Sequence, residues 1–396
     1  MSTGDSRSIS RRKLLRQSVL AGSLCLPSLR HLALFDLLDD LSARAWQDGT
    51  LLEVVPFSGE GNPPMGKAVG TELDGRLLTD LSTLTPENPL TPVDRFFIRT
   101  RASKLLNTST PWVIHLGGLI NKPETIRVET LANQARSMGG HLIECSGNAR
   151  TAHFGLMSAA AWDGELLEDI LKAAKPRVSG ARLLVSGFDR YKEESMTSVA
   201  GASWIFSLEQ LFSAGAFLAT KMNGQPLSAD HGAPVRLLVP GWYGCVCIKW
   251  VDQIDYVPDD TAATSQMREY AGRTLQSGVP AVAREYQPAT MGAVAMPVRI
   301  EKWRIAGKVR YRIAGILWGS PRPSHGLGIR FNPGEEFVLV EGVEPPAEDS
   351  WSFWSHAWSP PRPGEYTIRM RMKTGNLDTR RLDAGYYDRS VEIAEI

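Results

Sequence analysis

A cysteine and an arginine share one short, glycine-containing turn near the middle of the chain. Residues Glu144 to Arg150 read Glu-Cys-Ser-Gly-Asn-Ala-Arg, and residues 141–144 predict a short buried strand that runs into this turn. Positive charge near a thiol favours the thiolate, which is the form that binds a soft metal ion. Cys145 is therefore a candidate metal ligand. A buried structural cysteine beside a surface arginine explains the same residues equally well.

A second group of polar residues lies further along the chain and offers three cations. His231 and Arg236 flank the entry to an expected strand at residues 235–239, and Lys249 follows just beyond its turn. Cations that converge at strand ends can hold a phosphate-bearing cofactor. Taken separately, each residue also has a plainer explanation, as a turn histidine, a surface arginine or a surface lysine.

The chain contains four cysteines, at positions 25, 145, 245 and 247. They lack the repeated Cys-x-x-Cys spacing that is typical of zinc sites. Cys245 and Cys247 stand two apart on an expected strand, so their side chains face the same way and a disulfide between them would be strained. Beyond Cys25, which we place in a leader, we expect free thiols.

Four motifs follow one another in a fixed order. They are Leu90-Thr91-Pro92 with Phe96-Phe97-Ile98-Arg99, then Cys145-Ser-Gly-Asn-Ala-Arg150, then the run from Asn223 to Arg236, and finally Pro240-Gly241 with Lys249-Trp250. In order and spacing these motifs resemble the sulfite oxidase family of molybdopterin-dependent oxidoreductases, in its bacterial form without a haem domain. The resemblance covers about residues 88–270 well and the C-terminal part more weakly.

The resemblance implies a mononuclear molybdenum that is bound by the dithiolene of one pyranopterin and by one cysteine thiolate, here Cys145. It implies that Arg99 and Arg150 face an oxyanion pocket and that Tyr270 is the active-site tyrosine. Cofactor-contacting positions are filled by Phe97, Thr100, Arg101, Asp189, His231, Arg236, Cys247, Ile248 and Lys249. Two of these, Arg101 and Cys247, replace histidines that are common in the animal enzymes.

One departure from the family concerns the substrate pocket. Vertebrate members bring a further arginine into it from their C-terminal domain, and the matching position here is Ala384. Arg380 and Arg381 are close in sequence, and whether either reaches the active site stays open. The substrate is therefore less well defined by the sequence than the cofactor is.

The elements that must position these motifs fall into two groups. Up to about residue 280, strands such as residues 181–186 mix with helices such as residues 166–174, and a polar surface excursion is expected at residues 261–280. Beyond it the pattern predicts strands without intervening helices. These expected strands lie at residues 298–316, 337–343, 366–372 and 390–396.

We therefore expect an α+β fold with two domains. Residues 46–284 form a mixed α/β molybdopterin-binding catalytic domain of the sulfite oxidase type. Residues 285–396 form an immunoglobulin-like β-sandwich, which in the family serves dimerisation and so implies a homodimer.

Composition excludes some partners. Lys and Arg number 44 against 43 Asp and Glu, which argues against nucleic acid or an anionic membrane as the main partner. No run of residues reaches the apolar length of a transmembrane helix, so we expect no stable membrane insertion.

The first 45 residues read as an export signal. Ser10-Arg11-Arg12-Lys13-Leu14-Leu15 resembles a twin-arginine signal, and a short, weakly apolar stretch follows at residues 18–29. A chance Arg-Arg pair in a basic tail is the alternative. We expect export to the periplasm.

Together these features imply a periplasmic sulfite dehydrogenase that oxidises sulfite to sulfate by oxo transfer. The sequence has no Cys-x-x-Cys-His haem motif, so we expect electrons to pass to a separate periplasmic c-type cytochrome. The same cofactor could instead act on another small oxo-acceptor or donor, such as a sulfur-chain intermediate or a sulfoxide. A cofactor-free binding module is a further alternative, against which the intact Cys145, Arg99 and Arg236 speak.

Overall fold

The computed structural model describes residues 46, 48–107, 109–196, 198–319, 326–340, 342–343, 350–373 and 377–396. The expected export signal, with Cys25, lies outside these residues. The chain forms two compact units. Of the described residues, the first unit comprises 46, 48–52 and 303–309, and the second comprises those within 53–302 and 310–396, which include the whole candidate site.

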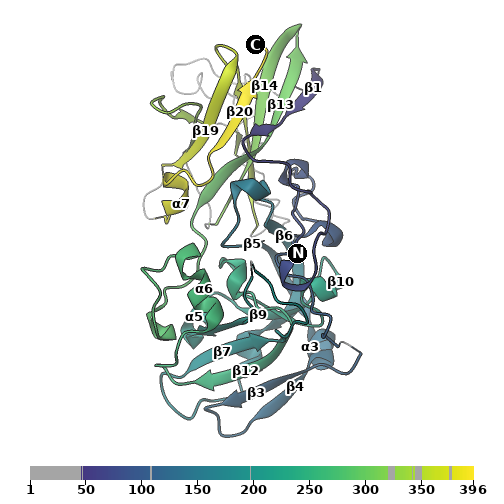
Figure 1. The fold of residues 1–396 in the computed structure, drawn as a ribbon, viewed down its shortest axis with the longest axis vertical. Helices are drawn as coiled ribbons and strands as arrows, with labels where there is room; N and C mark the ends of the chain where they lie inside the picture. Colours follow the sequence, from purple (N-terminus) through teal and green to yellow (C-terminus); the bar gives the residue numbers. More distant parts are fainter. Residues whose placement is uncertain are drawn as a thin grey trace, which may run out of the picture. The chain divides into compact units, whose positions relative to one another are not determined.

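Two five-stranded sheets build the part of the second unit that carries the motifs (Figure 1). One has the order β4-β3-β12-β7-β8, with β4 Glu124–Arg127, β3 Val113–Gly118, β12 Val251–Val257, β7 Arg182–Gly187 and β8 Ser203–Phe206. The other has the order β10-β9-β6-β5, with β11 also paired to β9, and spans β10 Gln225–Pro226, β9 Phe217–Met222, β6 Met157–Leu166, β5 Arg136–Glu144 and β11 Arg236–Leu238.

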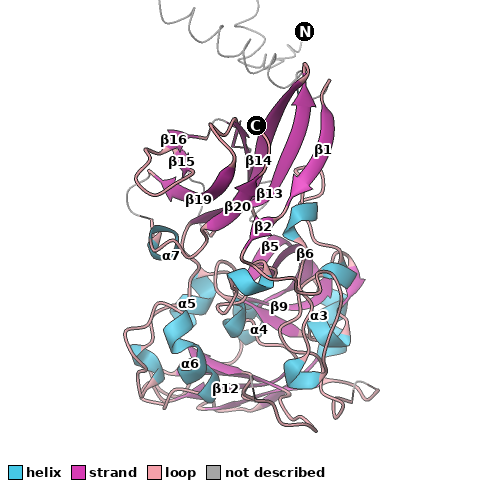
Figure 2. Cartoon of the chain, turned by 45° about the horizontal axis from the view of Figure 1, so that its top comes forward, coloured by secondary structure: helices cyan, strands magenta, loops and turns pink. Residues whose placement is uncertain are grey.

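Short helices pack beside these sheets, as Figure 2 shows. They are α3 Val128–Gln134, α4 Leu167–Leu171, α5 Leu208–Ser213 and α6 Ser265–Tyr270. Helix α5 begins with a capping box, in which Ser207 and Gln210 each bond the other's backbone N–H. Strand β9 is almost completely buried along its length, as expected for a strand covered on both faces.

Two further five-stranded sheets contain the C-terminal strands, which confirms the expected β-rich second part. One has the order β1-β13-β14-β18-β17, with β1 Thr50–Val55, β13 Val294–Ile305, β14 Lys308–Trp318, β18 Ser352–Trp358 and β17 Gly342–Val343. The other has the order β16-β15-β19-β20-β2, with β16 Val338–Leu339, β15 Leu327–Arg330, β19 Gly364–Met372, β20 Arg389–Ile393 and β2 Phe57–Ser58. Trp358 joins their cores, since its ring stacks on Phe331 at 4.5 Å and meets Tyr366 edge-on at 4.9 Å.

Three expectations change in detail. The strand expected at residues 298–316 is a hairpin, because Ala306 and Gly307 both take positive φ angles (48° and 77°), as a tight primed turn requires. Residues 57 and 58, which we expected in the first domain, pair instead with β20. The polar stretch at residues 261–280 contains helix α6, whose Met267 is fully buried.

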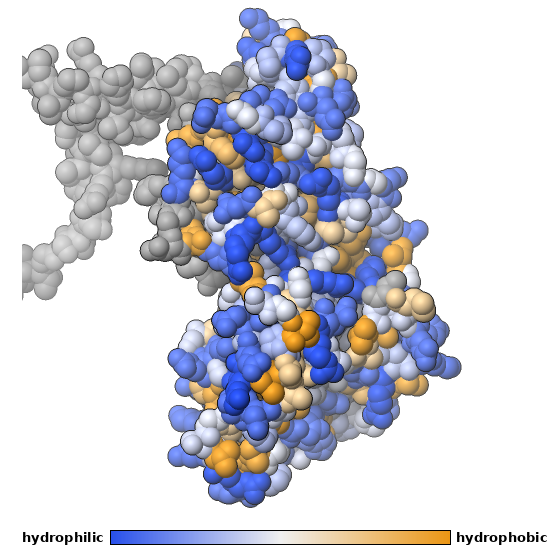
Figure 3. All heavy atoms as spheres, turned by 60° about the vertical axis from the view of Figure 1, so that its left-hand side comes forward, coloured by the Kyte–Doolittle hydropathy of each residue, from blue (hydrophilic) through white to orange (hydrophobic). Residues whose placement is uncertain are grey.

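On the face drawn in Figure 3, apolar residues form scattered spots among polar ones. Within the described residues, no helix is both long and apolar enough to span a bilayer.

Candidate active site

Cys145 follows directly on the end of β5 and is 5% exposed. Its backbone N–H donates to Leu156 O at 2.9 Å, and its carbonyl accepts from Asn148 N at 2.9 Å. The Asn148 amide then closes the loop, with bonds to Phe154 O (2.9 Å) and from Leu156 N (3.0 Å). The thiol is therefore held on a loop that its own polar residues fix in place.

The Cys145 thiol opens into a pocket with about 890 Å³ of atom-free space, part of it open to solvent. Its walls bring together eleven of the predicted site residues: Phe97, Arg99, Thr100, Cys145, Asp189, His231, Arg236, Cys247, Ile248, Lys249 and Tyr270. Burial raises the pKa of the Cys145 thiol, and the positive charge of Arg99 opposes this shift.

A second arginine, Arg76, lies close to Arg99 and belongs to none of the four motifs. Arg99 Nη1 donates to Ser198 Oγ at 2.9 Å, and Arg76 Nη2 donates to the same oxygen at 3.0 Å. Burial and the charge of Arg99 lower the pKa of Arg76 to about 10. Neither guanidinium forms an ion pair with a carboxylate among the described residues. Two guanidinium groups that converge on Ser198 make a site suited to an anion.

Arg236 lies at the inner wall of the pocket and is 6% exposed. Its terminal nitrogens donate to His231 O and Cys247 O, each at 3.2 Å, while its buried Nε has no partner in the described part of the chain. Burial lowers its pKa to about 10. A buried guanidinium that bonds only to carbonyls retains its full positive charge for a ligand.

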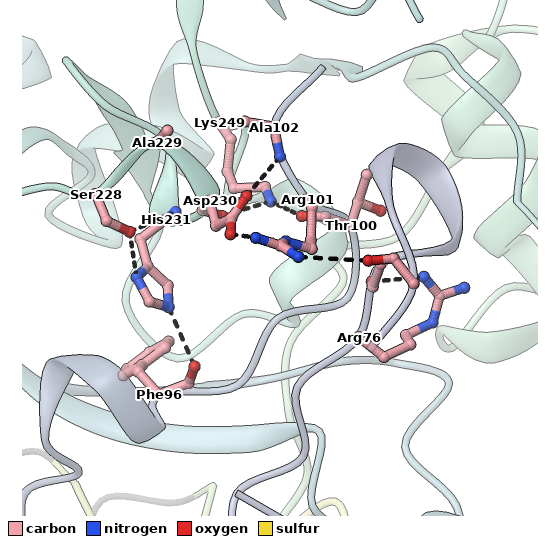
Figure 4. Close-up of polar contacts among 12 residues, drawn as sticks. Arg76, Phe96, Thr100, Arg101, Ala102, Ser228, Ala229, Asp230, His231 and Lys249 are labelled. Carbon is pink, nitrogen blue, oxygen red and sulfur yellow. Dashed lines mark hydrogen bonds and ion pairs between the residues drawn. The ribbon is translucent and has the colours of Figure 1, made fainter. Parts of the chain in front are cut away.

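Lys249 brings a second charge to this wall. Its Nζ donates to Asp230 O at 2.9 Å and to Thr100 O (Figure 4). Burial and the nearby charge of Arg236 lower the pKa of Lys249 to about 7. The Asp230 carboxylate does not neutralise it directly, because it pairs with Arg101 at 2.9 Å and accepts from Ala102 N at 2.8 Å.

His231 plays a different part from the cation that its sequence position suggested. Its Nε2 lies 3.1 Å from Phe96 O and its Nδ1 lies 2.8 Å from Ser228 Oγ (Figure 4). A carbonyl only accepts, so Nε2 carries the proton and Nδ1 accepts from the hydroxyl. Burial lowers the pKa of His231 to about 4. The imidazole is therefore neutral at pH 7 and fixes the Phe96 backbone against the loop that carries Ser228.

Tyr270, at the end of α6, lines the pocket near both Cys145 and Arg99. Burial raises its pKa to about 12, so the phenol keeps its proton at neutral pH and can donate it in a hydrogen bond. Arg273, one turn further on, lies over the Tyr270 ring at 5.5 Å.

Two predicted residues lie outside the pocket walls. Arg101 is engaged with Asp230, as described above. Arg150 is exposed, on a single 3₁₀ turn that is followed by left-handed backbone at His153 (φ 47°) and Phe154 (φ 55°). Its oxyanion role stays a prediction that the pocket geometry does not support.

The two C-terminal arginines differ from each other. Arg380 pairs with Asp378 at 3.2 Å on the surface. Arg381 turns inward, and its Nη2 donates to Ser146 O at 2.8 Å, one residue from the candidate metal ligand. Arg381 therefore reaches the backbone of the cysteine loop without lining the pocket.

Sequence reasoning missed Arg76, Ser198 and Tyr191. Ser198 and Tyr191 line the pocket, and Arg76 braces Arg99 through Ser198. None belongs to a recognisable motif. The one local signal is Gly75, where a Cβ would lie 2.1 Å from the Arg101 side chain, so that only glycine lets the chain pass before Arg76.

These residues fit an anionic metal cofactor. The buried Arg236 Nε lacks a partner among the described residues, Lys249 lies beside it, and the Cys145 thiol faces the same space. A phosphate group would be complementary to the positive charges of Arg236 and Lys249. A thiolate is a suitable ligand for a soft metal whose other ligands are also sulfur atoms. Arg236 and Lys249 would hold the phosphate end, and Cys145 would bind the metal.

Comparison with known proteins agrees with this fit. Residues 103–265 match the model of the oxidoreductase molybdopterin binding domain. The chain is 26% identical over 201 residues to sulfite oxidase of Arabidopsis thaliana, which covers 46% of this chain and 51% of that protein. It is 28% identical over 202 residues to mitochondrial sulfite oxidase of Macaca fascicularis, with 48% and 37% covered.

Other relatives include a nitrate reductase [NADPH] of Aspergillus niger, 27% identical over 215 residues, with 50% of this chain and 24% of that protein covered. The matches thus span a quarter to a half of the length of these relatives.

Among solved structures, the sulfane dehydrogenase SoxCD from Paracoccus pantotrophus has the same fold, with a TM-score of 0.60 at 19% identity over 86% of this chain and 91% of that one. The motifs, the pocket and these matches together identify residues 103–265 as a molybdopterin-binding oxidoreductase domain that is similar to the corresponding domain of sulfite oxidases.

Proposed function

We propose that this protein is a periplasmic molybdenum-cofactor oxidoreductase that oxidises sulfite to sulfate and passes the electrons to a separate cytochrome c. The observation that carries the proposal is the shared pocket of Cys145 and Arg99. It combines a thiol that can bind a soft metal with a guanidinium that has no carboxylate partner among the described residues. A small sulfur oxyanion needs both, next to each other.

When bound, the cofactor supplies oxygen-atom transfer and accepts two electrons. The protein supplies position and charge. Arg99 binds the oxyanion with its planar fork, and Ser198 and Arg76 hold that fork in place. Tyr270, whose pKa is raised to about 12 by burial, donates its phenolic hydrogen to the bound oxyanion.

The cellular setting of the proposal rests on sequence. Arg11 and Arg12 support export by the twin-arginine route, and the sequence has no haem-attachment motif of its own. We further propose a homodimer through the β-sandwich, since closed two-fold pairing is the commonest oligomer. Light scattering at working concentration should give twice the chain mass. A monomer would refute the dimer but would leave the proposed active site unaffected.

A second candidate is oxidation of a sulfane sulfur, the reaction that the name of SoxCD assigns to that enzyme. Two observations favour it. Arg150 stands outside the pocket, which leaves fewer cations for a free oxyanion than the family resemblance implies. In addition, Val199 lines the pocket at 60% exposure and so offers apolar surface to a sulfur chain.

Steady-state turnover of the molybdenum-loaded protein distinguishes these candidates. Sulfite, a sulfane-sulfur compound and a sulfoxide would be compared, with cytochrome c as acceptor for the two oxidations. Sulfite oxidation should reduce two equivalents of cytochrome c per sulfite, because each haem takes one electron. Protein with full molybdenum that ignores sulfite but oxidises the sulfane compound would replace the first candidate by the second.

A further inference from the structure

Glu144, the residue before Cys145, is an acidic side chain with no solvent exposure. Its Oε2 accepts from Trp318 Nε1 at 2.9 Å, and its Oε1 accepts from Tyr387 Oη at 2.8 Å and from Asn148 Nδ2 at 3.4 Å. All three partners donate, which is the pattern that an ionised carboxylate requires. The pKa of Glu144 is raised, because burial outweighs the opposing effect of these donors.

Two of these partners, Trp318 and Tyr387, come from the C-terminal part of the chain. Trp318 is the last residue of β14, and Tyr387 lies between helix α7 (Arg380–Asp383) and β20. Their rings meet edge-on at 5.3 Å, and they are 3% and 2% exposed. The carboxylate of Glu144 is thus enclosed by a rigid aromatic corner that belongs to the β-sandwich.

The other side of Cys145 is held by the same part of the chain. Arg381 Nη2 donates to Ser146 O at 2.8 Å and to Arg273 O at 2.5 Å, and Tyr386 Oη donates to Asn148 O. The Arg381 guanidinium is in turn packed 4.7 Å over the Tyr243 ring.

The residues on either side of Cys145, Glu144 and Ser146, therefore both form hydrogen bonds with residues of the β-sandwich. The loop's own bonds fix its shape, whereas these contacts fix where it sits. Leaving a buried carboxylate without hydrogen-bond donors is unfavourable, so these contacts are not easily broken.

We propose that Glu144 is a positioning residue that ties the metal-binding cysteine to the β-sandwich, so that Trp318 and Tyr387 set the orientation of the Cys145 thiol. This inference rests on the proposed role of Cys145 as metal ligand. Arg381 holds the loop on the other side of Cys145 through its hydrogen bond to Ser146 O. In this protein the C-terminal arginine acts on the backbone of the ligand loop.

The test compares two tyrosine variants that each lose only a buried hydroxyl. Tyr387→Phe removes one donor to Glu144. Tyr366→Phe removes a matched bond, from Tyr366 Oη to Arg362 O at 2.6 Å, elsewhere in the sandwich. Both are loaded with molybdenum, and the electron paramagnetic resonance spectrum of the one-electron-reduced metal is recorded, because its g values depend on thiolate orientation.

Tyr387→Phe should shift the g values and lower kcat about tenfold, at unchanged metal content and unchanged KM for the substrate that turns over. Glu144→Gln should act in the same direction, and Tyr366→Phe should match wild type. Wild-type spectra and kcat in Tyr387→Phe, or an equal shift in Tyr366→Phe, would overturn the positioning role. Cys145→Ser separates the two claims, because a wild-type spectrum in that variant would remove the ligand assignment itself.

Discussion

Arg76 and Arg99 direct their guanidinium groups at one oxygen, the hydroxyl of Ser198, at 3.0 and 2.9 Å. Like charges this close repel, and the lowered pKa of Arg76 reflects that repulsion together with burial. A bound anion relieves the repulsion, so the pair is prepared for a negatively charged substrate.

The first prediction concerns the charge of the substrate. Arg99→Gln should raise the KM for sulfite more than tenfold, because losing a charged hydrogen bond costs about 1.5–3 kcal/mol. Arg99→Lys should recover only part of the loss, since a point charge does not reproduce the fork. Steady-state kinetics on protein of equal metal content measures both. A KM within twofold of wild type in Arg99→Gln would show that Arg99 does not bind the substrate.

The second prediction uses competition by a product-like anion. Sulfate should inhibit the wild type competitively and inhibit Arg76→Gln less, because Arg76 adds charge at the same site without lining the pocket. Arg150→Gln is the matched control, an exposed arginine outside the pocket that should keep the wild-type inhibition constant. If Arg150→Gln weakens sulfate inhibition and Arg76→Gln does not, the anion site has been assigned to the wrong arginine.

The third prediction concerns pH and the cofactor-free protein. Burial and Arg236 lower the pKa of Lys249 to about 7, whereas an unfolded chain has a lysine pKa of about 10.4. Between these values the unfolded state binds more protons, so the free energy of unfolding rises with pH, by at most about 1.4 kcal/mol per pH unit. Denaturant unfolding at several pH values across this window measures the slope.

Lys249→Met supplies the comparison, because it fills the same space without a titrating group. The variant should be less dependent on pH above neutrality and should retain less molybdenum, having lost one cation at the proposed phosphate end. An unchanged slope together with full metal retention would exclude Lys249 from both roles.

The fourth prediction tests export. Replacing Arg11 and Arg12 together by lysine should strand the protein in the cytoplasm, since the translocase reads the arginine pair. Cell fractionation with a twin-arginine substrate as marker measures the distribution. Normal periplasmic delivery of the double variant would remove the argument for this route.

Sequence reasoning identified the pocket because its residues sit in contiguous motifs at strand ends. Cys145 follows β5, Arg236 begins β11, and Lys249 lies just before β12 and forms a bridge with Arg236, so predicting strands at these places already brought the side chains together. Arg150 does not line this pocket: it is exposed on a 3₁₀ turn that precedes left-handed backbone at His153 and Phe154, and its oxyanion role stays a prediction.

Residues that arrive from irregular loops could not be found in this way. Arg76 follows a single 3₁₀ turn and an extended glycine, and Ser198 lies in a loop; neither has the periodicity that marks an element. The hydrogen bonds of Trp318 and Tyr387 to Glu144 could not be predicted either, because both residues are far from Glu144 in sequence. Only the packed sandwich reveals why an acidic residue stands before the cysteine.

The most direct test of the central claim is the number of sulfur atoms bound to the metal. Molybdenum X-ray absorption on the wild type should show three sulfur ligands, two from the dithiolene and one from Cys145, since thiolates bind soft metals. Cys145→Ser should show two and lose turnover, while Cys245→Ser should still show three. A Cys145→Ser protein that keeps three sulfur ligands and wild-type turnover would contradict the account.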